Sequence, residues 1–331
     1  GIDRIHLPTI QRRNLLALGA MAAVTPWSLG QAAAFPSKPL RIVVPFSAGA
    51  LTDIIARIYA EKLQALLGQT VTVENRPGAG GITASQHLLQ QPADGHTLLF
   101  VSSAHAANPA LRNKLPYDTE RDFAGLALLA TSPSVVVVPA DHPARTLEDL
   151  IRQGKDKPNT LSYGSAGVGS ATHLAGEYFR AEAGLQMVHI PFKGVQEALS
   201  AVAGKQLDLA FPPIALALPL IKGGRIRALA VTSPRRVATM GDTPTVAEKG
   251  HPGFDSSIWY ALVMHAGTPA PVQQALAQQV LRVTDMPDVA DKLRSQGLIQ
   301  ERLVLAEFDR FIAADIRKLG NLARASGIQP E

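Results

Sequence analysis

Short apolar runs alternate with amphipathic segments along most of the chain after residue 39. Leu40–Val44 is an apolar run broken only by Arg41, which is typical of a strand buried on both faces of a parallel sheet. Apolar residues then recur at helical spacing from Ile54 to Leu67, with Thr52 placed to cap the helix start and Gly68 placed to end it. The same reasoning predicts further strands at 71–74, 97–101, 161–163, 187–190, 207–211, 226–231 and 260–264. It predicts further helices at 82–89, 147–151, 195–203, 270–283, 289–293 and 305–325, and another that ends at 181.

These strand and helix units fall into two groups, which predicts two lobes. The stretch 126–138 contains an apolar segment, a Thr-Ser-Pro interruption and four valines, as expected where a chain crosses between sheets, and we place this crossing near Pro133. After residue 264 only helices are predicted, and helices alone cannot form a third domain, so the C-terminal segment is expected to return to the first lobe. The predicted fold class is therefore α/β, with lobe 1 at 35–134 and 261–331, lobe 2 at 135–260, and a ligand cleft between them.

The N-terminal segment, residues 1–34, has the features of an export signal. Arg12 and Arg13 precede an uncharged run at 15–29, and small residues end at Ala34. The paired arginines favour a twin-arginine signal that is cleaved near Ala34 and directs the protein to the periplasm. An uncleaved membrane anchor is the alternative, although Pro26 interrupts the apolar run and the run is short for a membrane span.

Composition narrows the classes of function. Among the 331 residues 46% are hydrophobic and 18% are charged, which is typical of a globular protein. The chain has no cysteine, so a disulfide framework, a thiolate nucleophile and a cysteine metal site are excluded. The net charge is +5; residues 1–34 carry three arginines and one aspartate, which leaves +3 for the rest. This weak basicity favours anionic ligands slightly, and no basic run interleaved with aromatic residues points to nucleic acid.

Four loops follow predicted strands and lead toward helices, at 45–53, 102–105, 165–173 and 191–194. In open α/β sheets ligands lie beyond the carboxyl ends of the strands, where the first amides of helices are unpaired. We treat 102–108 as a polar loop. The candidate ligand-binding residues in these four loops are Phe46, Ser47, Ala48, Gly49, Thr52, Ser102, Ser103, His105, Ser165, Ala166, Gly167, Ser170, Thr172, His173 and Lys193.

The first and third of these loops share small and hydroxylated residues, so that two helix starts, one in each lobe, are expected to hold one carboxylate. No arginine lies in the four loops, and recognition by amides, hydroxyls and water is expected. Each feature has a plainer interpretation. The glycine-rich connections can be ordinary turns, His105 and His173 can be capping or packing residues, and Lys193 can be a solvated surface group. We expect Asp53 to be a first-turn carboxylate and not a ligand contact.

No enzymatic motif is present. The sequence lacks a Gly-x-Ser-x-Gly elbow, a His-Glu-x-x-His pair, a phosphate-binding loop and a correctly spaced dinucleotide fingerprint. Nine histidines are scattered without metal-ligand spacing, and His173 with Ser165 is a weak nucleophile and base pair. We therefore expect a binding protein without catalytic residues, metal or cofactor. A hydrolase or transferase on the same scaffold and a sensory ligand-binding subunit are the alternatives.

The chain from 35 to 328 resembles the Bug-type receptors of tripartite tricarboxylate transporters. The motifs that carry the resemblance are Pro-Ser-Lys-Pro-Leu (36–40), Val-Pro-Phe (44–46), Thr-Asp (52–53), Glu-Asn-Arg-Pro-Gly-Ala-Gly-Gly (74–81), Asp-Gly-His-Thr-Leu-Leu (94–99), Leu-Pro-Tyr-Asp (115–118), Thr-His-Leu-Ala-Gly-Glu (172–177), Pro-Phe-Lys-Gly (191–194) and Arg-Ala-Leu-Ala-Val-Thr-Ser (227–233). Together they are specific to that family.

The resemblance implies a two-lobed type II periplasmic-binding fold, a small carboxylate in the cleft (a dicarboxylate, tricarboxylate or aromatic acid) and two membrane subunits of a transporter as partners. It implies that the loops 46–53 and 165–173 form the two halves of the carboxylate site. Ser102 to His105 and the segment after Phe211, including Pro212, would shape its distal end. The absence of a coiled-coil pattern favours a monomer.

Two departures from the family pattern affect the expected ligand. Ala50 and Leu51 stand where the first loop usually carries consecutive glycines, which can narrow the site. Phe211-Pro212-Pro213 stands where many relatives have a polar and often acidic residue, so a partner for an amino group is lost. We therefore expect a ligand without an ammonium group.

Overall fold

The computed structural model describes residues 34–331, and Phe35–Glu331 form one compact unit. The predicted export signal, apart from Ala34, lies outside the described residues. Within the described part of the chain, no helix combines the length and the apolar character needed to span a bilayer.

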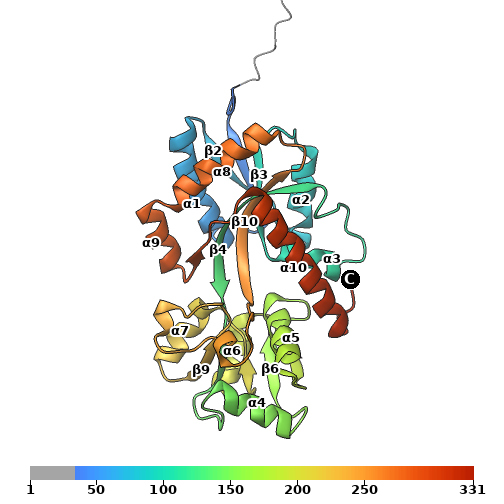
Figure 1. The fold of residues 1–331 in the computed structure, drawn as a ribbon, viewed down its shortest axis with the longest axis vertical. Helices are drawn as coiled ribbons and strands as arrows, with labels where there is room; N and C mark the ends of the chain where they lie inside the picture. Colours follow the sequence, from blue (N-terminus) through green and yellow to red (C-terminus); the bar gives the residue numbers. More distant parts are fainter. Residues whose placement is uncertain (1–33) are drawn as a thin grey trace, which may run out of the picture. The chain divides into compact units, whose positions relative to one another are not determined.

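Lobe 1 is built on a six-stranded sheet with the strand order β11-β4-β10-β3-β1-β2 (Figure 1). Strands β1, β2 and β3 pair in parallel, while β10 runs antiparallel to both β3 and β4. The strands are β1 (Leu40–Val44), β2 (Val71–Asn75), β3 (Thr97–Ser102), β4 (Phe123–Pro133), β10 (Ser257–His265) and β11 (Ile299–Gln300). The helices are α1 (Leu51–Leu67), α2 (Ile82–Gln90), α3 (Ala104–Leu111), α8 (Ala270–Thr284), α9 (Pro287–Ser295) and α10 (Leu305–Ala325).

Helices cover both faces of this sheet. Successive side chains of a strand point to opposite faces, so neighbouring residues pack against different helices. In β1, Ile42 packs with α1, α8 and α9, whereas its neighbour Val43 packs on the opposite face with α2, α3 and α10. The apolar residues of 40–44 therefore face both sides of the sheet, as in a doubly covered strand, and the one charged residue of the run, Arg41, is exposed. The C-terminal helices pack on lobe 1, and strand β11, which was not predicted after residue 264, pairs there with β4.

Lobe 2 is built on a five-stranded sheet with the strand order β7-β6-β8-β5-β9. Helices α4 and α5 cover one face, and α6 and α7 cover the other. The strands are β5 (Val135–Pro139), β6 (Ser162–Ser165), β7 (Val188–Pro191), β8 (Leu209–Ala210) and β9 (Ile226–Val231). The helices are α4 (Leu147–Asp156), α5 (Ala171–Ala183), α6 (Val195–Ala203) and α7 (Ile214–Lys222).

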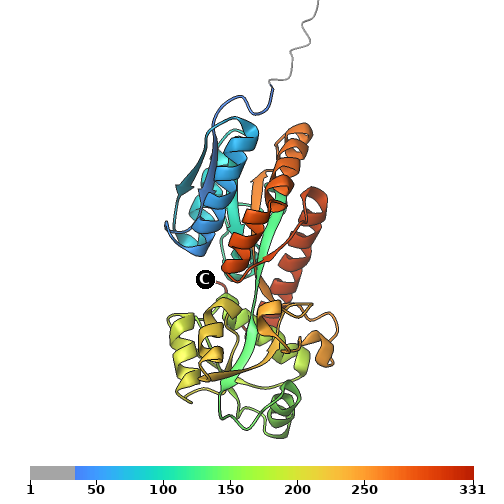
Figure 2. The same ribbon diagram turned by 90° about the vertical axis from the view of Figure 1, so that its left-hand side faces the viewer.

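Two chain crossings join the lobes. Strand β4 ends at Pro133 and β5 begins at Val135, so the first crossing lies where the sequence placed it (Figure 2). Strand β10 returns to the first sheet at Ser257 and pairs there with Pro133. Residues 257–260, which we assigned to lobe 2, therefore belong to the sheet of lobe 1, because pairing with β4 begins before the apolar run that marked the strand.

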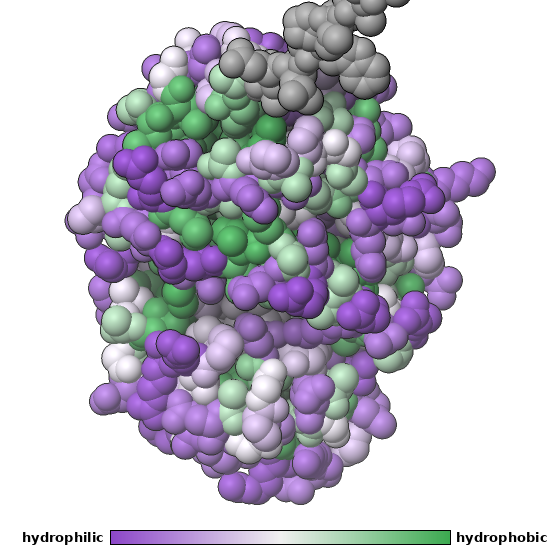
Figure 3. Space-filling view, turned by 45° about the horizontal axis from the view of Figure 1, so that its top comes forward, coloured by the Kyte–Doolittle hydropathy of each residue, from purple (hydrophilic) through white to green (hydrophobic). Residues whose placement is uncertain are grey.

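The structure corrects two further expectations. The segment 102–108 was expected to be a polar loop, but Ala104–Leu111 forms α3, which buries Ala106 and Ala107. Helix α7 was not predicted at all. Both helices contain a proline, Pro109 or Pro219, and alanine-rich turns give a weak periodic signal. The surface seen in Figure 3 is largely hydrophilic, with hydrophobic residues gathered mainly in its upper part.

Candidate functional site

A cleft of about 1290 Å³ lies between the two lobes. From lobe 1 it is lined by Leu51 and Thr52 at the start of α1 and by Ser103 before α3. From lobe 2 it is lined by Ser170 and Ala171 at the start of α5. The first turns of two helices from different lobes therefore face one cavity, and such turns offer unpaired N–H donors and the positive end of the helix dipole.

The loop before α1 is held from behind by Asp53. This side chain is only 3% exposed, and it accepts hydrogen bonds from Gly49 N (2.9 Å), Arg57 Nε (2.9 Å) and Asn75 Nδ2 (2.9 Å). Asn75 Nδ2 also donates to the carbonyl of Phe46 at 2.9 Å. Burial would raise the pKa of Asp53, but the bonds from Arg57, Gly49 and Asn75 outweigh it and lower that pKa. Both oxygens of this carboxylate are thus occupied by donors from the loop, from α1 and from β2.

The first turn of α1 lacks a side chain that accepts hydrogen bonds from its backbone amides. No side chain caps the helix, because Ala50 stands at the N-cap position. Thr52 lines the cleft, and its buried Oγ1 has no hydrogen-bond partner among the described residues. A buried hydroxyl without a partner costs free energy, and at a cleft wall it is available to a ligand oxygen.

The loop before α5 is held by hydrogen bonds between backbone amides and side chains of the loop and the first turn of α5. Ser170 Oγ caps α5 by accepting from His173 N at 3.2 Å, and Thr172 Oγ1 accepts from Ala166 N at 2.8 Å. Gly167 and Gly169 take positive φ angles of 123° and 80°, which glycine adopts without strain. Thr172 and His173 therefore point back into the loop, while Ser170 also lines the cleft.

The structure brings only some of the predicted site residues to the cleft wall. Those that line it are Phe46, Thr52, Ser102, Ser103 and Ser170. Exposed loop residues that lie outside this lining are Ser47, Ala48, Gly49 and Lys193. Residues that shape the α5 loop without lining the cleft are Ser165, Ala166, Gly167, Thr172 and His173.

The two other predicted residues are buried in the lobes. His105 is 4% exposed and packs edge-on against Phe123 with ring centroids 5.1 Å apart. Complete burial lowers the pKa of His105 to about 4, so it is a neutral packing residue at ordinary pH. Pro212 is buried, and its carbonyl accepts from Val135 N at 3.0 Å. Neither residue lines the cleft.

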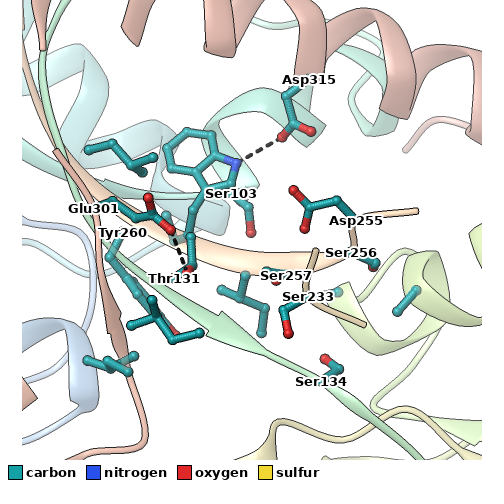
Figure 4. Close-up of a pocket in the computed structure, with 18 of the residues that line it drawn as sticks. Ser103, Thr131, Ser134, Ser233, Asp255, Ser256, Ser257, Tyr260, Glu301 and Asp315 are labelled. Carbon is teal, nitrogen blue, oxygen red and sulfur yellow. Dashed lines mark hydrogen bonds between the residues drawn. The ribbon is translucent and has the colours of Figure 1, made fainter. Parts of the chain in front are cut away.

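Sequence reasoning missed the wall of the cleft that lies at the crossings (Figure 4). Its labelled residues are Thr131, Ser134, Ser233, Asp255, Ser256, Ser257, Tyr260, Glu301 and Asp315, besides Ser103. Trp259 Nε1 donates to Asp315 Oδ2 at 2.9 Å, and Thr131 Oγ1 donates to Glu301 Oε1 at 3.1 Å. Burial raises the pKa of both carboxyl groups. These residues come from segments far apart in the chain, and only the strand pairing brings them together.

The lobes also touch each other within the lining of the cleft. Lys318 on α10 donates to the carbonyl of Asp255 at 2.6 Å, and its ammonium lies 4.0 Å from the centre of the Tyr178 ring on α5. Ala107, Leu174 and Leu322 form a small apolar cluster from α3, α5 and α10. This contact joins elements of both lobes next to the start of α5.

The sequence offered one pair, Ser165 with His173, that could support catalysis. Within residues 34–331, no group of three or more His, Asp or Glu side chains is arranged to hold a metal. Ser165 Oγ lies 2.6 Å from His189 Nε2, but Ser165 is completely buried, so a substrate could not reach this hydroxyl. His173, the base considered from the sequence, accepts instead from Gly169 N at 3.0 Å.

Comparison with known proteins agrees with this geometry. Residues 55–328 match the family described as "Tripartite tricarboxylate transporter family receptor". The chain is 37% identical over 294 residues to the UPF0065 protein of the tcbD-tcbE intergenic region of Pseudomonas sp. strain P51, which covers 88% of each chain.

Two solved structures are similar along nearly their whole length. A TctC solute-binding protein from Polaromonas is 26% identical, with a TM-score of 0.80, over 88% of this chain and 99% of that one. The R. palustris protein Rpa4515, solved with adipate, is 29% identical, with a TM-score of 0.72, over 90% of this chain and 100% of that one. The family description names a transporter receptor, and the Polaromonas structure is described as a solute-binding protein. The chain therefore belongs to the receptor family of the tripartite tricarboxylate transporters.

Proposed function

We propose that this protein is a periplasmic receptor that captures a small carboxylate in the interlobe cleft and delivers it to the membrane subunits of a tripartite tricarboxylate transporter. The observation that carries the proposal is that the first turns of α1 and α5, from opposite lobes, line the same cleft. Unpaired amides at helix starts suit a carboxylate, and approach of the lobes would surround it from both sides.

Part of the cleft lining suits a ligand with an apolar body. Aliphatic and aromatic side chains such as Phe46, Leu111, Leu128 and Leu174 line it beside the polar residues at the crossings, and four cationic side chains that suit an anionic ligand also line it: Arg235, Arg236, Arg294 and Lys318. The relative Rpa4515 was solved with adipate, whose two carboxylates are separated by four methylene groups. We therefore propose an aliphatic or aromatic carboxylic acid without an ammonium group, bound through amides and hydroxyls.

A calorimetric and thermal-shift screen tests this function. Adipate, longer and shorter dicarboxylates, citrate, benzoate, aspartate and glutamate are titrated into the full chain at pH 7.5. A ligand present at about 100 times its Kd should add about 2.7 kcal/mol to the free energy of unfolding. If no carboxylate stabilises the protein, the proposal fails. If only aspartate or glutamate binds tightly, the exclusion of ammonium ligands is wrong.

The unpartnered hydroxyl of Thr52 supplies a matched variant. Thr52→Val keeps the shape of the side chain and removes a buried oxygen that lacks a partner in the described residues. The ligand-free protein should therefore be as stable as the wild type or slightly more stable, whereas the affinity for the carboxylate should fall about tenfold. Equal affinity of the two proteins would show that α1 does not contact the ligand through this side chain.

A further inference from the structure

A cluster of aromatic and polar side chains lies behind the α5 loop in lobe 2. The imidazole rings of His173 on α5 and His189 on β7 are stacked, with centroids 3.7 Å apart and an angle of 5° between the ring planes. Tyr163 on β6 packs on His189 with centroids 5.0 Å apart. None of the three lines the cleft, so any effect they have on a ligand acts through the loop in front of them.

Each imidazole is connected to one glycine amide of that loop. Gly169 N donates to His173 Nδ1 at 3.0 Å. Gly167 N donates to Ser165 Oγ at 3.0 Å, and the same Oγ lies 2.6 Å from His189 Nε2. Because the two glycines have positive φ angles and many accessible conformations, these bonds restrict them, and together with the bonds from Ala166 N to Thr172 Oγ1 and from Ser165 Oγ to the Gly167 carbonyl they hold one loop conformation.

The bonding pattern defines the protonation state of the stack. His173 Nδ1 accepts a hydrogen bond, so its proton is on Nε2, which faces Glu177 Oε1 at 3.7 Å. Burial would raise the pKa of Glu177, but hydrogen bonds from His173, Tyr163 and Arg180 lower it, and the group is a carboxylate. A doubly protonated His173 has no acceptor for Gly169, so the loop conformation requires the neutral ring.

The neighbouring ring is neutral as well. Burial, together with the closeness of His173, lowers the pKa of His189 to about 4. Two parallel imidazoles at this distance could not both be doubly protonated, and so positively charged, without strong repulsion. The stack is therefore a neutral, rigid support for Ser165 and for the first turn of α5.

We propose that His173 and His189 are positioning residues that hold the loop 165–171 in the conformation that presents the start of α5 to the ligand. The inference deepens the proposed function, because it assigns the support of one half of the carboxylate site. It assigns no ligand contact to either ring.

Paired variants separate the hydrogen bond from the volume of the ring. His173→Asn places a carbonyl oxygen near the position of Nδ1 and can still accept from Gly169, whereas His173→Leu fills similar space without an acceptor. His189→Phe keeps a stacked ring and loses the contact with Ser165. His251→Leu is the control, since His251 lies on the surface loop after residues 247–249 and outside the cleft lining.

The first readout needs no ligand. Backbone amide exchange is followed by ¹⁵N NMR at pH 7.5 in the ligand-free full chain. The protection factor of the Gly169 amide should fall about tenfold in His173→Leu, which corresponds to about 1.4 kcal/mol, and should be unchanged in His173→Asn. The amide of Gly167 should lose protection in His189→Phe. The second readout is the Kd for adipate, expected to rise about tenfold in His173→Leu and less than threefold in His173→Asn.

These readouts distinguish failure of this inference from failure of the proposed function. If the wild type binds no carboxylate, the proposed function fails, while the glycine amides still decide whether the histidines hold the loop. If His173→Leu keeps the protection of Gly169 and the wild-type Kd, the positioning role is overturned. The same holds if His173→Asn and His173→Leu lose stability and affinity equally, because the rings then only fill space.

Discussion

Replacement of Asp53 by asparagine tests the support of the other half of the site. Both carboxylate oxygens of Asp53 are occupied: Oδ2 by Gly49 N and Arg57 Nε, and Oδ1 by Asn75 Nδ2. An asparagine in the same rotamer presents one oxygen and one NH₂ group. Whichever way this amide is turned, at least one donor of the loop faces another donor.

The expected loss follows from these contacts. A buried donor that loses its partner costs about 1–3 kcal/mol. The lost attraction to Arg57 adds at most about 0.5 kcal/mol, because that side chain is 54% exposed and screened by solvent. We expect Asp53→Asn to lower the free energy of unfolding by about 2 kcal/mol at pH 7. The affinity for the carboxylate should fall about tenfold, because the loop before α1 is no longer held.

Urea denaturation at several pH values, followed by calorimetric titration, measures both effects. The folded-state pKa of Asp53 is lowered, so its contribution to stability is present above the unfolded value near 4 and disappears as the pH falls through the folded value. The difference between wild type and variant should therefore shrink below about pH 4. Asp288→Asn is the control, since this carboxylate is 51% exposed and pairs with Lys62 outside the cleft lining. A variant at Asp53 with unchanged stability and affinity at pH 7 would refute the reasoning.

Three further changes have clear expected outcomes. Gly176→Ala should destabilise lobe 2 by about 1–2 kcal/mol in urea denaturation. The new Cβ would lie 2.3 Å from a ring carbon of the buried Tyr163, and the cost of this overpacking exceeds the gain of about 1 kcal/mol in helix propensity. An equally stable variant would mean that the ring can move away. Asp315→Asn should raise the Tm at pH 7 and leave it unchanged at pH 3.5. Burial raises the folded-state pKa of Asp315, so the wild-type protein loses stability as the pH rises from the unfolded-state pKa through the folded-state pKa, whereas the amide of the variant does not titrate. A lower Tm of the variant at pH 7 would contradict this. Lys193→Ala should leave the Kd for adipate within about twofold, because Lys193 is exposed and lies outside the cleft lining, and a larger loss in calorimetry would return this residue to the site.

Local pattern predicted most elements of this fold. The apolar run 40–44 and the helices 195–203 and 305–325 were predicted with the bounds that the structure has, because buried faces repeat with a clear period. Helix α3 was missed, since its alanines and Pro109 give neither a strong periodicity nor a helix-favouring composition around the proline.

The candidate site was less predictable than the fold. Glycine and serine composition identified the two loops, and five of the predicted residues line the cleft. The side chains that support the loops come together through strand pairing between distant segments. His189 lies next to Ser165 because β6 and β7 pair in parallel with Tyr163 opposite His189. The crossing wall with Trp259 and Asp315 depended likewise on the pairing of β10 with β4. Such proximity arises from tertiary structure and has no local sequence signal.

The two crossings are tied together within lobe 2. Thr232 Oγ1 accepts from Ser134 N at 3.0 Å, and the carbonyl of Thr232 accepts from Ser256 N at 3.0 Å. Ser134 and Ser256 also line the cleft. Rotation of one lobe against the other would bend the chain close to these residues, so the hinge and part of the cleft lining are made of the same two segments.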